Sequence, residues 1–130
     1  MPTAELNRRV VQEFYDLAFV RKRYAEAADA YFGDRYIQHN AFVADGIDAF
    51  KEHFGTSQAH LAPDYVQRPL RFIADEDLVA VHVWLRRHAE DTGIVLVDIF
   101  RLENGKIVEH WDVGMPIPDE DTIPHRNGVL

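Results

Sequence analysis

Four strand-length runs of alternating residues between residues 66 and 114 constrain the fold of this chain more than any other feature. The runs are expected at 66–74, 78–89, 93–103 and 106–114, with short polar or glycine-containing segments between them. The last of these segments contains Asn104-Gly105, a strong signature of a tight β-hairpin turn. Connections this short join antiparallel neighbours. The region therefore predicts an antiparallel meander of long strands.

Helical patterns precede the strands. Leu6, Val10, Phe14 and Leu17 recur at helical spacing, which predicts a helix over residues 4–20. An alanine-rich helix is expected over 24–32, a short extended piece over 36–39, and a third helix that begins after Asp45-Gly46. Helices followed by a meander are typical of an α+β domain whose helices cover one face of the sheet. At 130 residues we expect one domain, residues 1–130, that ends in an irregular proline-rich tail over 115–130.

Composition excludes several classes of function. The formal net charge of −8 argues against nucleic acid and anionic membrane surfaces as partners, because both demand a basic surface. The absence of cysteine excludes disulfides, thiolate catalysis and cysteine–zinc sites. The first residues form no apolar signal run, and no stretch is apolar for long enough to span a membrane. We therefore expect a cytoplasmic protein.

Alternation along the strands sorts their residues into two faces. One set is almost entirely aliphatic: Val79, Val81, Val83, Leu85, Val95, Val97, Ile99, Ile107 and Trp111. The other set mixes aromatic and ionisable residues: His82, Trp84, Arg86, Leu96, Asp98, Phe100, Val108, His110 and Asp112. Ligand pockets are mainly apolar with a few placed polar groups. We therefore expect the mixed set to line a concave, helix-covered face. The aliphatic set would either pack as core against another element or form a subunit interface, and we favour a homodimer.

Two short motifs place polar groups inside segments that otherwise have the pattern of buried strands. They are Tyr36-Ile-Gln-His39-Asn40 and Glu109-His110-Trp111-Asp112-Val113. Burying such groups costs several kcal/mol unless they are paired or used. The motifs therefore predict a pocket lined by polar groups.

The arrangement of these motifs resembles the SnoaL-like polyketide cyclases of the nuclear transport factor 2-like superfamily. The resemblance covers residues 4–115 and includes two helices before the first motif, a short helix opened by Gly46, and the closing Asn-Gly-Lys-Ile-Val-Glu-His-Trp-Asp-Val. It implies a cone-shaped α+β fold, a curved and mostly antiparallel sheet around a deep pocket, and frequent dimers. It also implies that Asp112 is the base of a cofactor-free aldol closure and that His39 and Asn40 are pocket residues. Ala41 departs from the family, which often has proline there.

The candidate residues have distinct expected roles. Asp112 would remove a proton alpha to a carbonyl, because a carboxylate in an apolar pocket has a raised pKa. His110 would polarise the carbonyl or orient Asp112. His39 and Asn40 would donate hydrogen bonds to an oxyanion. The alternative for each is structural: an ion pair or backbone cap for Asp112, a core hydrogen bond for His110, and local turn bonds for His39 and Asn40.

A second set of candidates comes from the same predicted face. Trp84 and Phe100 would line the pocket for a flat ring, or else only pack in the core. His82 and Asp98 are secondary polar candidates. Asp98 is expected to be a second acid or an ion-pair partner of Arg86.

These residues predict an enzyme that abstracts a proton alpha to a carbonyl, as an aldol cyclase, isomerase or dehydratase does. Its substrate would be a small hydrophobic, cyclic or polyketide-like molecule, and no cofactor or metal is expected. Three alternatives stay open: a non-catalytic binding module, a dimeric interaction protein with a vestigial pocket, and an epoxide hydrolase. The last would need Asp98, Asp112 and Arg86 around one water.

Overall fold

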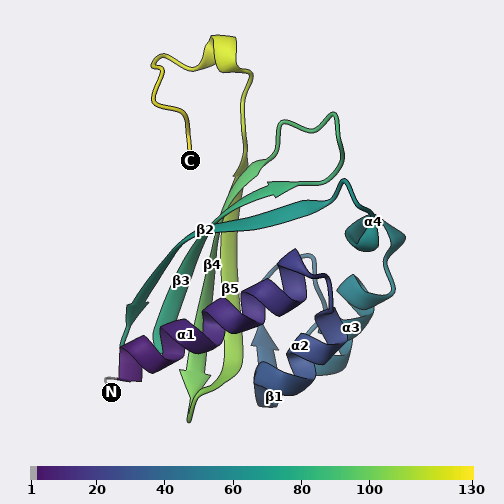
Figure 1. Ribbon diagram of the computed structural model, residues 1–130, viewed down its shortest axis with the longest axis vertical. Coiled ribbons are helices and arrows are strands. Elements are labelled where there is room, and N and C mark those ends of the chain that lie inside the picture. Colours follow the sequence, from purple (N-terminus) through teal and green to yellow (C-terminus); the bar gives the residue numbers. More distant parts are fainter. Residues whose placement is uncertain (1–2) are drawn as a thin grey trace.

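The computed structural model describes residues 3–130 and begins with helices, as the sequence predicts. Helix α1 (Thr3–Tyr15) continues into a π-helical turn (Asp16–Val20), so the expected helix over 4–20 is present with a change of pitch near its end. Helix α2 (Tyr24–Tyr31), helix α3 (Ile47–Gly55) and the single turn α4 (Gln58–Leu61) follow. Figure 1 shows α1 lying across one face of the sheet, with α2 and α3 beside it.

The sheet has five strands in the order β1-β5-β4-β3-β2. Strands β2 (Val66–Asp75), β3 (Leu78–Arg86), β4 (Ile94–Glu103) and β5 (Lys106–Pro116) form the expected antiparallel meander. Strand β1 (Phe32–Gln38) pairs with β5 in parallel. Between β4 and β5, Asn104 and Gly105 both have positive φ, as a type I′ turn requires. The α+β class predicted from the sequence is confirmed.

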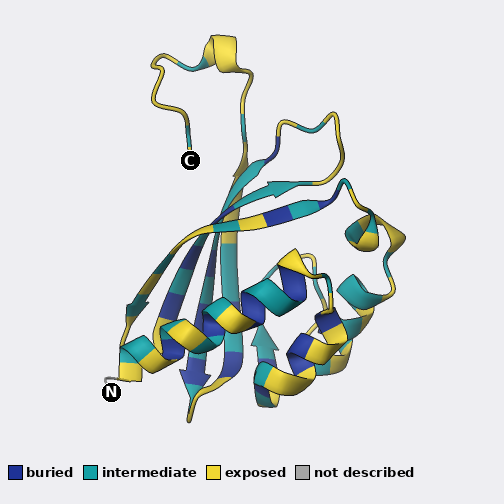
Figure 2. Cartoon of the chain, viewed as in Figure 1, coloured by how far each residue is buried: buried dark blue, intermediate teal, exposed yellow. Residues whose placement is uncertain are grey.

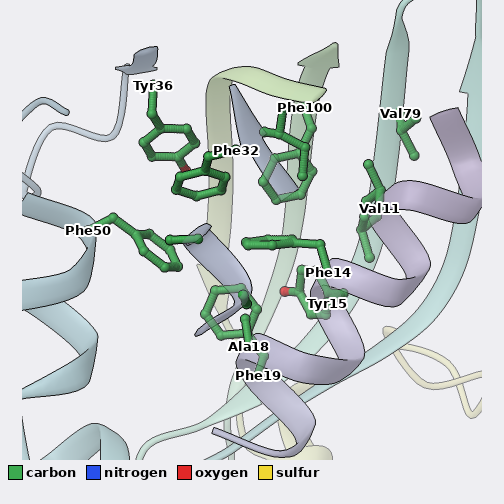
Figure 3. Packing of buried hydrophobic residues seen from close by; sticks show 14 of the residues in the cluster. Val11, Phe14, Tyr15, Ala18, Phe19, Phe32, Tyr36, Phe50, Val79 and Phe100 are labelled. Atoms are coloured by element: carbon green, nitrogen blue, oxygen red, sulfur yellow. The ribbon is translucent and has the colours of Figure 1, made fainter. Parts of the chain in front are cut away.

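The core lies between α1 and the sheet (Figure 2). Val11, Phe14, Tyr15 and Ala18 recur at helical spacing and are completely buried against β2 and β3. Phe14 lies at the centre: its ring packs within 6.4 Å, centre to centre, of the rings of Phe19, Tyr31, Phe32, Phe50 and Phe100. Figure 3 shows the rings of Phe14, Phe19, Phe32, Phe50 and Phe100 converging from the helices and the sheet.

The structure corrects several predicted boundaries. Strand β1 begins at Phe32, well before the expected extended piece at 36–39, because Phe32 pairs with Ile107 of β5. Strand β5 runs on to Pro116, so the tail is shorter than expected. The rest of the tail carries one short 3₁₀ turn (Glu120–Thr122) and extends away from the body of the molecule (Figure 1).

The predicted grouping of the two sheet faces is wrong for β3. Cross-strand partners share a face, and Val79, Val81 and Val83 pair with Phe100, Asp98 and Leu96. These valines therefore belong to the buried, helix-covered face, and so do Leu85 and Ile107. Ile107 changes sides because a bulge between Arg101 and Leu102 shifts its pairing. Apart from Ile107, the other aliphatic-set residues of β4 and β5 lie where predicted: Val95, Val97, Ile99 and Trp111 are on the uncovered outer face.

No helix among residues 3–130 is long and apolar enough to cross a membrane.

Candidate active site

A cavity of about 500 Å³ opens between the helix-covered face of the sheet, helix α3 and the loop after β1. Most of its wall is aromatic or aliphatic; the lining includes Phe19, Tyr36, Phe50, Phe54, Tyr65, Leu96 and Phe100. Five of its polar residues gather where β1, β4 and β5 meet: Gln38, Asn40, Asp98, His110 and Asp112. An apolar cavity with a few convergent polar groups is typical of a small-molecule site.

The centre of the polar wall is His110, which is buried on β5. Its Nε2 lies 2.8 Å from Asp98 Oδ1 and 3.8 Å from Asp112 Oδ2. The three residues come together because Asp98 pairs with Asp112 across β4 and β5, and Phe100 pairs with His110 beside them. Asp98 and His110 therefore meet on a diagonal of one sheet face, as the alternation of β4 and β5 predicted.

Gln38 holds the other side of the imidazole ring. Its Oε1 lies 2.7 Å from His110 Nδ1 and also accepts the backbone N–H of Asn40 at 3.0 Å. The second bond fixes which end of the Gln38 amide faces the ring, so Nδ1 must donate to it. Both ring nitrogens of His110 are therefore held by neighbouring side-chain oxygens, those of Gln38 and Asp98.

A buried chain of donors ends on Asp98. The Tyr65 hydroxyl donates to Gln67 Oε1 (2.7 Å), Gln67 Nε2 donates to the Tyr15 hydroxyl (2.8 Å), and Tyr15 donates to Asp98 Oδ2 (2.7 Å). Burial and the nearby Asp98 charge raise the pKa of the Tyr15 hydroxyl well above its usual range, so Tyr15 stays a donor. With His110 on its other oxygen, the Asp98 carboxylate is fully engaged by protein groups. The predicted pairing of Asp98 with Arg86 is wrong.

Asp112 is the carboxylate that remains open to the cavity. Its side chain is 16% exposed, against 4% for Asp98. Asn40 Nδ2 donates to both Asp112 oxygens, at 2.9 and 2.8 Å, and Asn40 Oδ1 accepts the backbone N–H of Phe42. Burial raises the pKa of Asp112, while the bond from Asn40 and the nearby His110 partly oppose the rise. A half-buried carboxylate of raised pKa is suited to accept a proton.

The structure places His39 outside this group. Residue 38 pairs with residue 110 in the parallel β1–β5 ladder, so alternation directs Gln38 and Asn40 toward the cavity and His39 toward the outer face. The His39 ring stacks on Trp111 with centres 4.9 Å apart, and its Nε2 lies 2.7 Å from Glu109 Oε2. Although His39 lies at the edge of the cavity, its imidazole is engaged on the outer face.

His82 and Trp84 also lie on the outer face, contrary to prediction. They pair with Val97 and Val95, away from the helices. His82 Nδ1 contacts Arg71 at 2.7 Å, and the guanidinium groups of Arg68 and Arg86 lie over the Trp84 ring, at 5.1 and 5.7 Å from its centre. Arg86 is thereby kept out of the cavity, so the set that an epoxide hydrolase would need is not assembled. Phe100, in contrast, lines the cavity as expected.

Three ligand atoms of Asp98, His110 and Asp112 lie within 4.8 Å of one another. Carboxylate oxygens and an imidazole nitrogen are a donor set that divalent transition metals accept. A cation at this point would have to displace the proton that lies between His110 and Asp98. The hydrogen-bonded arrangement of the three residues already satisfies each of them without such a cation.

The sequence patterns did not assign Tyr15, Tyr36, Gln38, Tyr65 or Gln67 to the site. Alternation within the first motif could have identified Tyr36 and Gln38, since they share the parity of Asn40. Tyr15 and Gln67 could not be identified in this way. A local sequence pattern does not distinguish a buried polar residue from an exposed one when its hydrogen-bond partner is distant in the chain. His53 and His60, which the sequence patterns also left unassigned, line the cavity as well.

Comparison with known proteins identifies the family and the fold. The model of the SnoaL-like domain family matches residues 11–110. No curated protein matches the chain significantly. Among solved structures, a candidate ketosteroid isomerase from Kribbella flavida is 17% identical with a TM-score of 0.72, covering 97% of this chain and 93% of its own. A candidate polyketide cyclase from Acidithiobacillus ferrooxidans is 16% identical with a TM-score of 0.68, covering 88% of this chain and 91% of its own.

At 16–17% sequence identity, structural similarity is evidence for the fold alone. It confirms the cone-shaped α+β architecture that the sequence predicted. The family model covers most of the chain, including Gln38, Asn40, Asp98 and His110. The chain belongs to the SnoaL-like domain family.

Proposed function

We propose that this protein is a cofactor-independent enzyme that removes a proton alpha to a carbonyl in a small hydrophobic, cyclic substrate. The observation that supports the proposal is that two neighbouring carboxylates, those of Asp98 and Asp112, have different surroundings. Asp98 is saturated by Tyr15 and His110, whereas Asp112 is open to an apolar cavity of about 500 Å³. Environments that separate two carboxylates in this way assign the base to the one that can reach substrate.

In this mechanism the Asp112 carboxylate takes the proton from the α-carbon. The C–H electron pair becomes the new C=C bond, and the carbonyl π electrons move to the oxygen, giving an enolate. Asn40 fixes the Asp112 carboxylate through both of its oxygens. His110, held by Asp98 and Gln38, lies beside it, with Nε2 3.8 Å from Asp112 Oδ2. The enolate then reacts by isomerisation, dehydration or aldol closure, and the proton on Asp112 is available for return.

The pH dependence of exchange tests the protonation state of the base. We use the incorporation of solvent deuterium into the α-carbons of 2-tetralone, a flat cyclic ketone, followed by NMR. Because burial raises the pKa of Asp112 and only the ionised carboxylate accepts a proton, the enzymatic rate should rise with pH through a midpoint above the ordinary aspartate value and then level off. A rate that falls with rising pH across this range would contradict the assignment of Asp112 as the base.

The same proposal includes a homodimer formed by the uncovered sheet face. That face carries Val95, Val97, Ile99 and Trp111, and beside them Val113 and Met115 are 69% and 51% exposed. A cluster of apolar side chains on an open sheet face is typical of an association surface.

Val97→Asp tests the homodimer, because a charge buried without a partner costs at least about 2 kcal/mol. It should raise the dimer dissociation constant roughly 30-fold or more in sedimentation. The control is Val20→Asp, which adds the same charge at an exposed position after α1 and should leave the dimer intact. Equal dissociation constants for the two variants would place the interface elsewhere.

A further inference from the structure

The hydrogen-bond donors on the polar wall are almost all in use. Both ring nitrogens of His110 are engaged, by Asp98 and by Gln38. The Asn40 amide donates to both oxygens of Asp112. An enolate needs a donor at its oxygen, because the negative charge that leaves Asp112 develops there. Neither residue can supply that donor without giving up a bond that holds the site together.

Tyr36 is the remaining hydroxyl at this end of the cavity. The residue is 3% exposed, and its ring stacks on Phe32 at 4.1 Å and lies 6.1 Å from the His110 ring, centre to centre. Figure 3 shows the two stacked rings side by side, with the Tyr36 hydroxyl at the inner end of its ring. Tyr36 also belongs to the cavity wall. The aromatic stacking fixes the ring, so the direction of the hydroxyl is set before a ligand binds.

The Tyr36 hydroxyl stays protonated, and its hydrogen is available for donation to a ligand. Burial, together with the charges of Asp98 and Asp112, raises the pKa of Tyr36 well above its usual range, so the phenol stays neutral. The nearby Gln38 side chain only partly opposes this rise of the pKa. Within residues 3–130, no protein acceptor takes the hydrogen of this hydroxyl.

We infer that the Tyr36 hydroxyl is the catalytic donor that binds the substrate carbonyl oxygen and stabilises the enolate formed when Asp112 removes the α-proton. The inference rests on the proposed function and extends it to Tyr36, the first residue of the motif that also contains His39 and Asn40. The α-proton moves to Asp112, and the electron pair it leaves ends on the oxygen. The Tyr36 O–H bond does not break; its hydrogen bond to that oxygen shortens and strengthens as the charge develops.

Tyr36→Phe is the direct test, since it deletes one oxygen and keeps the ring that packs on Phe32. The rate of deuterium exchange into 2-tetralone at saturation should fall roughly 10²-fold, the usual loss for one donor to a developing oxyanion, with little change in KM. Tyr31→Phe is the matched control: the Tyr31 hydroxyl contacts only Glu13, at 3.3 Å on the surface, and the variant should keep the wild-type rate. An unchanged rate in Tyr36→Phe would overturn the inference.

A binding measurement separates this inference from the proposed function. 2-Naphthol carries a hydroxyl where an enol oxygen would lie, and naphthalene has the same ring system without it. Tyr36→Phe should weaken the binding of 2-naphthol about tenfold and leave naphthalene unchanged. Equal weakening of both ligands would mean that the ring, not the hydroxyl, was lost, and would overturn the inference. If Asp112→Asn lowers exchange while Tyr36→Phe does not, the inference fails and the proposed function stands; if the wild-type protein itself gives no exchange, the proposed function fails.

Discussion

Asp112→Asn is expected to lower the rate of α-proton exchange by roughly 10²–10⁴-fold, the range that a positioned general base contributes. The amide is nearly the same size as the carboxylate but cannot take up a proton at neutral pH. The fold should tolerate the change, because the carbonyl oxygen of the new amide can still accept the bond from Asn40 Nδ2. The loss should appear in the maximal rate more than in KM, because the carboxylate acts on the reacting carbon.

Two controls make this result interpretable. Asp48→Asn makes the same substitution on an exposed residue in the first turn of α3 and should keep the wild-type rate. Naphthalene binding to Asp112→Asn should match the wild type, which would show that the cavity is intact. Exchange at the wild-type rate in Asp112→Asn would remove Asp112 from the mechanism.

Phe14→Ala is expected to reduce the free energy of unfolding by about 3–5 kcal/mol, the usual loss for a large aromatic in a well-packed core. Phe14 has no exposed surface and contacts rings from α2, β1, α3 and β4. Its removal leaves a cavity that those elements cannot close without moving the sheet against the helices. Because single domains of this size have a total stability of roughly 5–15 kcal/mol, the melting temperature should fall by roughly 10–20 °C.

Phe42→Ala is the matched control for stability. The same atoms are removed from a side chain that is 92% exposed in the loop after β1, so the free energy of unfolding should change by less than about 0.5 kcal/mol. Chemical denaturation of the wild type and the two variants measures both effects. Equal losses in the two variants would contradict the packing described here.

The sequence predicted the elements of this fold well, and it predicted how they face one another less well. Periodicity located the helices and the four meander strands, and Asn104-Gly105 located the hairpin between β4 and β5. Alternation also joined Asp98, Phe100, His110 and Asp112 on one face. It could not relate the faces of β3 and β4, because their phase depends on where pairing resumes after the loop at residues 87–93. Grouping by chemical type therefore placed His82 and Trp84 on the wrong side.

The first motif shows the same limit. His39 and Asn40 are adjacent, so alternation within an extended segment sends their side chains to opposite faces. The family resemblance treated them as a pair, and only Asn40 has its side chain beside Asp112. Gln38, which shares the direction of Asn40, contacts His110. The buried chain from Tyr65 to Asp98 depends on α1 crossing β2 and β4, a long-range arrangement that no local pattern encodes.

The central claim is that the cavity ionises a carbon acid and does not merely hold a ligand. Its most direct test is the rate at which the wild-type protein introduces solvent deuterium into the α-carbons of 2-tetralone, compared with buffer at the same pH. We expect exchange above the buffer rate that saturates with ketone concentration and is competitively inhibited by 2-naphthol. Exchange no faster than buffer, from a protein that nevertheless binds 2-naphthol, would contradict the claim and identify the domain as a binding module.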